Sequence, residues 1–210
     1  MSGTLEVVVE VAEPRGETPW PVAPVPPEGR LRLWAGTPDD AIGLVVFHLA
    51  HYNSLPSEER AGEGEPAEVL RALAGAEALI VPGGLLLTTD AGRVVAPGCC
   101  CGLEGWREWA SLLVDGKSPW LGHDPSPWAE RVEGGVRVWP DGGLGTVDRA
   151  TLEPIDLPEG EFAAALGRAH ADLRAFLARL GEWAAAIAPD EAVGLVDRFD
   201  RAFSVRAPLG

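Results

Sequence analysis

The chain has 210 residues, and its hydrophobic content of 46% is typical of a soluble globular protein with one sizeable core. A formal net charge of −15 argues against partners such as nucleic acid or an anionic membrane surface, because both need basic patches on the protein. The sequence contains neither a run of about 18 apolar residues, as a membrane span needs, nor the basic and apolar regions of a signal peptide, so we expect a cytoplasmic protein.

The first third of the chain predicts two strands and a helix. Residues 5–11 and 31–34 alternate between apolar and polar positions, and six prolines between residues 14 and 27 hold the connection extended. Thr37 as N-cap and Pro38 at the first position, followed by two acids, predict a helix start. Residues 41–51 are apolar on all sides, so helix and buried strand compete there, and we favour the helix.

The middle of the chain predicts short elements joined by loops. An acidic loop is expected at residues 57–68 and an irregular Trp/Pro-rich stretch at residues 118–128. The expected helices and strands are a helix at 66–73, strands at 78–82, 85–89 and 93–95 with a hairpin loop at 90–92, a helix at 103–113 and a strand at 136–139.

The C-terminal quarter predicts two helices. Apolar residues recur at helical spacing between Pro158 and Pro189. A second helix at residues 190–203 is expected to bury one face, formed by Val193, Val196, Phe199 and Phe203. The fold class is therefore α+β, a small, mostly antiparallel sheet packed with a C-terminal helical hairpin. We expect one domain over 1–210, with a mixed core at 1–150 and the hairpin at 157–204.

The three cysteines form one uninterrupted triplet, Cys99–Cys101, and this cluster is unlike a disulfide framework. A thiol at a helix N-terminus has a lowered pKa, so Cys100 and Cys101 are candidate catalytic nucleophiles, with His123 and Asp124 as the base pair. A strained vicinal disulfide is another alternative. A third is a tightly packed turn, because cysteine is small and often buried.

Metal binding is the remaining interpretation of the triplet. Adjacent side chains diverge, so the spacing is poor for zinc, but Cys99 could serve together with a histidine. His48 and His51 would lie on one face of a helix as a two-ligand unit, whereas in a strand they would point apart. Flanked by apolar residues, both histidines are more often hydrogen-bonded residues of the core. The sequence identifies no cofactor.

Tryptophan is concentrated after the triplet. Candidate ligand-binding residues are Trp106, Trp109, Trp120 and Trp128, because tryptophan is enriched in binding sites. The same residues could instead form a core cluster. The loop Gly122–Pro125 lies between two of them, where binding residues tend to collect.

The segments Pro97–Glu104 and Trp120–Trp128 resemble a group of uncharacterised bacterial proteins with the pattern PGCCCGLEDWREW … WLGHDPSPW. Gly105 stands where that pattern has Asp. A composition rich in Ala, Gly, Arg and Pro also indicates a bacterial source. No activity is known for that group, so the resemblance transfers none to this chain; what it implies is an immunity-type or accessory role.

Two functions follow from these observations. The first is a non-catalytic protein that recognises a protein partner or a small ligand through the Trp/Cys/His123 region and its acidic surface. The second is a thiol-dependent enzyme or metal-binding protein that uses Cys99–Cys101 with His123 and Asp124, and His48 or His51 as further ligands.

Overall fold

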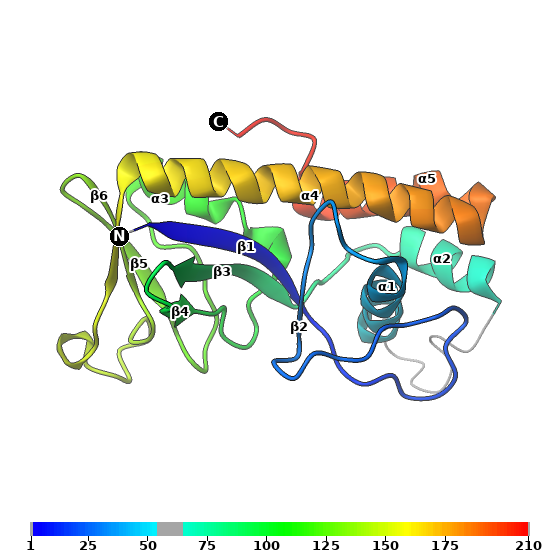
Figure 1. Ribbon diagram of the computed structural model, residues 1–210, viewed down its shortest axis with the longest axis horizontal. Helices are drawn as coiled ribbons and strands as arrows, with labels where there is room; N and C mark the ends of the chain where they lie inside the picture. The colour runs from blue at the N-terminus through cyan, green and yellow to red at the C-terminus, as the bar shows by residue number, and fades with distance from the viewer. Residues whose placement is uncertain (1, 54–64, 210) are drawn as a thin grey trace. The chain divides into compact units, whose positions relative to one another are not determined.

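The computed structural model describes residues 2–53 and 65–209 (Figure 1). The chain divides into two compact units. Unit 1 comprises Met1–Val8, Pro82–Ala171 and Pro208–Gly210, and unit 2 comprises Val9–Val81 and Asp172–Ala207. The acidic loop expected at 57–68 lies mostly outside the described residues, and the division of the chain into domains stays a prediction.

Unit 1 contains antiparallel strands, as the sequence predicts. In the first sheet β1 (Gly3–Glu10) lies beside β3 (Gly83–Thr89), which pairs with β4 (Val94–Val95) (Figure 1). The β3–β4 connection turns at Gly92, whose φ of +74° only glycine adopts easily. The hairpin expected around residues 90–92 is therefore confirmed.

A second antiparallel sheet in unit 1 was expected only at its central strand. It has the order β5 (Trp128–Val132), β6 (Gly135–Trp139) and β7 (Ile155–Pro158). Val132 pairs with Gly135, which leaves a two-residue turn in which Gly134 has a φ of +78°. The two outer strands were not predicted, because β5 follows directly on a Trp/Pro-rich stretch and β7 is only four residues long.

The prediction of one continuous helix at 103–113 is wrong. A single 3₁₀ turn, η1 (Leu103–Gly105), comes first, and α3 (Glu108–Asp115) begins only afterwards. Gly105, where the 3₁₀ turn ends, favours the interruption, because glycine weakens an α-helix. α3 then ends at Gly116 in the left-handed conformation, with a φ of +75°.

Unit 2 resolves the ambiguity at residues 41–51 in favour of helix. α1 (Asp39–Asn53) buries nine residues between Ala41 and Ala50. Thr37 does not cap it: its hydroxyl accepts a hydrogen bond from Trp34 N (3.0 Å) and donates to Trp34 O (2.9 Å), which closes the preceding turn. The other elements are β2 (Arg30–Arg32), slightly shorter than expected, and α2 (Pro66–Ala74), as expected.

The strand expected at residues 78–82 is not formed. Pro82, at the end of the segment, forms an isolated β-bridge with Gly102. At Ile80 the hydrogen-bond partner is not a neighbouring strand but the side chain of Asn53. Its Oδ1 accepts from Ile80 N (2.7 Å) and its Nδ2 donates to Ile80 O (2.8 Å). A side-chain amide can replace a strand partner at one residue but cannot extend into a ladder.

The C-terminal helical hairpin is confirmed by α4 (Glu159–Ile187) and α5 (Pro189–Phe203), which pack together (Figure 1). The predicted apolar face of α5 is wrong at Val193, which is 72% exposed; the buried positions include Ala192, Leu195 and Phe199. Among the described residues, no helix combines the length and apolar character needed to cross a membrane.

Candidate metal centre

Two loops of unit 1 run side by side and carry the residues that the sequence singled out. The first loop, residues 97–101, follows β4, and the second, residues 120–125, follows α3. Gly98 N donates to Leu121 O (2.7 Å), and His123 N donates to Cys99 O (2.9 Å). These two backbone hydrogen bonds fix the position of His123 relative to Cys99.

Glycine is required at both crossing points of the two loops. A Cβ at Gly98 would overlap the carbonyl oxygen of Pro125. A Cβ at Gly122, whose φ is +98°, would lie 2.5 Å from the carbonyl oxygen of Gly98. Only glycine allows two backbones to approach each other so closely. The sequence signal for this contact is a glycine immediately before the cysteine triplet and another immediately before His123.

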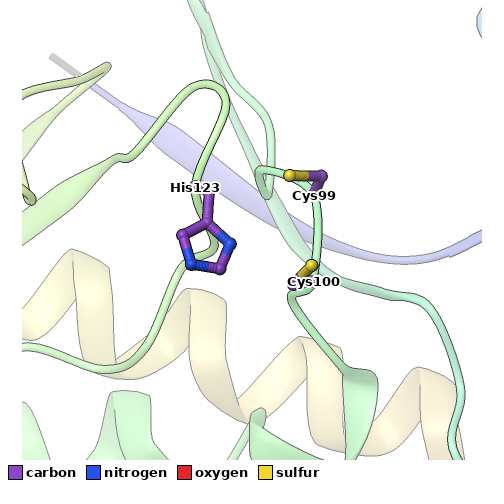
Figure 2. A group of neighbouring side chains, drawn as sticks. All are labelled: Cys99, Cys100 and His123. Atoms are coloured by element: carbon purple, nitrogen blue, oxygen red, sulfur yellow. The ribbon is translucent and has the colours of Figure 1, made fainter.

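The backbone turns sharply at Cys100, which has a φ of +62°. Positive φ is uncommon for residues other than glycine, and such residues cluster at functional sites. Adjacent side chains usually diverge, which argues against two neighbouring cysteines on one ion. Here, however, the Sγ atoms of Cys99 and Cys100 and a ring nitrogen of His123 all lie within 4.8 Å of one another. Figure 2 shows the imidazole on one loop, with a ring nitrogen turned toward the two thiols on the other.

Cys101 differs from its two neighbours. Its side chain is buried, whereas Cys99 and Cys100 are exposed. The Cys101 thiol donates to the carbonyl oxygen of Trp120 (3.6 Å). It also lies beside Gly84, where a Cβ would come within 3.2 Å of its sulfur. Cys101 therefore anchors the loop in the interior, and the two accessible thiols are those nearest His123.

Trp120 connects both loops to α3. Its indole Nε1 donates to Cys100 O (3.1 Å), and its backbone N donates to the carboxylate of Glu108 (2.8 Å). Its ring meets the imidazole of His123 edge-on, with 5.0 Å between the centroids. Trp120 thus holds the backbone of one cysteine and the ring of the histidine.

The structure lacks two features that a thiol nucleophile at this site would need. α3 begins at Glu108, so neither Cys100 nor Cys101 lies at the N-terminus of an α-helix, which is the position that the nucleophile interpretation assumes. Asp124 is exposed, and within residues 2–53 and 65–209 it makes no hydrogen bond to His123. The carboxylate that would orient a catalytic histidine is therefore not engaged.

The two other histidine candidates lie on α1 of unit 2. His48 is partly buried, and His51 is exposed. Burial, and next the nearby charge of His51, lower the pKa of His48 below its ordinary value of 6.5. Within the part of the chain that the structure describes, neither belongs to a group of three ligand side chains.

The four candidate tryptophans separate into core and surface. Trp106 and Trp109 are buried, and they pack on His170 and Phe162 respectively. Trp128 is partly buried, with the guanidinium of Arg149 5.2 Å from its ring centroid. Trp120 is 46% exposed, so it is the candidate with the largest accessible face.

The donor set of Cys99, Cys100 and His123 suits a borderline or soft transition metal ion. Thiolate sulfur and imidazole nitrogen are the ligands that Zn²⁺ prefers in proteins. At a Zn–S distance of about 2.3 Å, two thiolates on one tetrahedral ion lie roughly 3.8 Å apart. The present separation of at most 4.8 Å therefore has to close by no more than about 1 Å, which rotation of exposed side chains can supply.

Comparison with protein-family models, with curated proteins and with solved structures finds no match.

Proposed function

We propose that this protein binds a thiophilic divalent metal ion, with Zn²⁺ as the reference ion, through Cys99, Cys100 and His123. The observation that carries the proposal is the approach of the three donor atoms, within 4.8 Å of one another, from two loops. Hydrogen bonds between the loops support it, because they fix two of the donor residues before any ion arrives.

Preorganisation distinguishes this cluster from a chance meeting of side chains. Gly98 and Gly122 let the two backbones touch, and the indole N–H of Trp120 holds the carbonyl of Cys100. Groups that orient ligand residues are part of a metal site, because they lower the entropy that binding costs.

The test is a zinc titration of the full-length protein, reduced and metal-free, against a colorimetric zinc chelator. We expect one ion per chain. Replacement of a ligand, as Cys99→Ser, Cys100→Ser or His123→Ala, should lower the affinity on the order of 100-fold or more, since weaker perturbations of orienting groups already cost 10- to 100-fold. Cobalt substitution should add a thiolate-to-cobalt absorption that decreases in each cysteine variant.

Cys101→Ser is the matched control. It also removes a thiol from the triplet, but the thiol of Cys101 donates to the Trp120 carbonyl and is not one of the proposed ligands. Its zinc affinity should stay within a few-fold of the parent. Equal affinity in the Cys99→Ser and Cys101→Ser variants would contradict the proposal. So would a Cys99–Cys100 disulfide that persists under reducing conditions, which would point to redox chemistry instead.

A further inference from the structure

Resting on the proposed metal site, we infer that the bound ion keeps one coordination position for a ligand from solution, and that this ligand is a small organic thiol bound as its thiolate. The inference follows from the number of protein donors, from their exposure and from the charge of the complex.

The number of donors falls one short of a closed site. Structural zinc ions are held by four protein ligands, whereas sites with three keep a position for an exogenous ligand. Within the described residues, the group that can share an ion consists of Cys99, Cys100 and His123. Cys101 would be the obvious fourth ligand, but its thiol donates to the Trp120 carbonyl in the interior.

The open position is accessible from solvent. Cys99 and Cys100 are exposed and His123 is half-buried, so the ion would lie at the surface and not in the core. Trp120, 46% exposed, stands edge-on beside the imidazole and offers an apolar wall to a ligand that enters there.

The softness of the donors selects the class of ligand, and the charge of the complex permits an anion. A divalent ion with two thiolates and a neutral imidazole has no net charge, so an anion can bind without electrostatic opposition from the centre. The existing sulfur ligands mark the site as one for soft donors, which favours thiolate over carboxylate or phosphate. In the binding step the thiol displaces a metal-bound water and releases its proton to solvent, and a metal–sulfur bond forms without oxidation or reduction.

The experiment uses the full-length protein loaded with one equivalent of Co²⁺ and titrated with 2-mercaptoethanol, followed by visible absorption. We expect a saturable increase in thiolate-to-cobalt absorption that ends at one thiol per ion, with the cobalt still bound to the protein after gel filtration. Sodium acetate, a hard anion of similar size, serves as the control and should leave the spectrum unchanged at the same concentration.

Three outcomes would overturn the inference. A cobalt spectrum that ignores the thiol would mean that the coordination shell is already complete, and removal of the ion by the thiol would mean that no ternary complex forms. An equal response to acetate would mean that the position does not select thiols. Failure of the proposed function gives a separate signature, because the apoprotein would then take up no cobalt in the first step.

Discussion

Ligand-type residues gather in two places, the loops of unit 1 and helix α1 of unit 2, and the two places behave differently. In the loops, Cys99, Cys100 and His123 converge although His123 comes from a distant part of the chain. On α1, His48 and His51 are neighbours in sequence, yet no third donor of the described residues joins them. In both places a third ligand has to come from another segment. Backbone hydrogen bonds between two loops bring His123 beside the cysteines, whereas no described segment brings a donor beside the histidines of α1.

The largest expected effect tests the close contact between the loops. Gly98→Ala places a Cβ on the carbonyl oxygen of Pro125, so the loops must separate. We expect a loss of about 2–3 kcal/mol in unfolding free energy, typical of overpacking, together with a large loss of zinc affinity. Urea denaturation and zinc titration measure the two effects.

Gly167→Ala is the matched control for that variant. Gly167 lies in α4, and a Cβ added there would meet no heavy atom within 4 Å, so alanine should stabilise the helix by about 0.5–1 kcal/mol. If both variants showed the same change in stability, the close approach at Gly98 would have no energetic role.

The next effect concerns the residue that ties the loops together. Trp120→Phe keeps an aromatic ring beside His123 but removes the N–H that binds the Cys100 carbonyl. We expect a 10- to 100-fold loss of zinc affinity, with little change in the urea midpoint of the metal-free protein. Trp139→Phe removes the comparable Nε1 hydrogen bond from β6 to Glu130 and should leave zinc affinity unchanged. Equal zinc affinities in the two variants would mean that the Trp120 indole does not support the metal site.

A smaller effect is expected in unit 2, where Asn53 replaces a strand partner. Asn53→Ala leaves the backbone N–H and C=O of Ile80 to solvent, and we expect a loss of about 1 kcal/mol. Asn53→Asp retains the acceptor for Ile80 N but places a carboxylate oxygen against the carbonyl oxygens of Ile80 and Leu49, so it should lose at least as much stability as the alanine variant. Urea denaturation near pH 7 gives the comparison, and a fully stable Asn53→Ala would mean that water replaces the amide at no cost.

The smallest effect is a pH dependence at His48. Because its pKa is lowered in the folded state, chiefly by burial, the unfolded chain binds the proton more tightly. Folding stability is therefore expected to fall as the pH drops below the ordinary histidine value of 6.5, and to be unaffected by this group above it. His48→Gln should flatten part of the stability profile measured between pH 7.5 and 5.5, whereas His51→Gln should flatten it less, since it removes only the smaller, electrostatic cause. A steeper profile in His48→Gln would reverse the assignment.

Local patterns were sufficient for the regular elements. The apolar spacing between Pro158 and Pro189 predicted α4, and the alternation at residues 5–11 predicted β1, because both signals depend on periodicities that the backbone itself imposes. Prediction failed where a tertiary partner decided the outcome. Residues 78–82 have the composition of a strand but meet the side chain of Asn53, and Val193 fits an apolar stripe but remains exposed.

The candidate site shows the same division. The sequence by itself determined which residues could act as ligands, because thiols and imidazoles have the chemistry that a thiophilic ion requires, and it singled out Cys99–Cys101 and His123. Only the tertiary structure decided that Cys99 and Cys100 face His123 while Cys101 is turned inward. That choice depends on a positive φ at Cys100 and on backbone contact at Gly98 and Gly122, and such contacts arise from the packing of two loops that have no periodic pattern of their own.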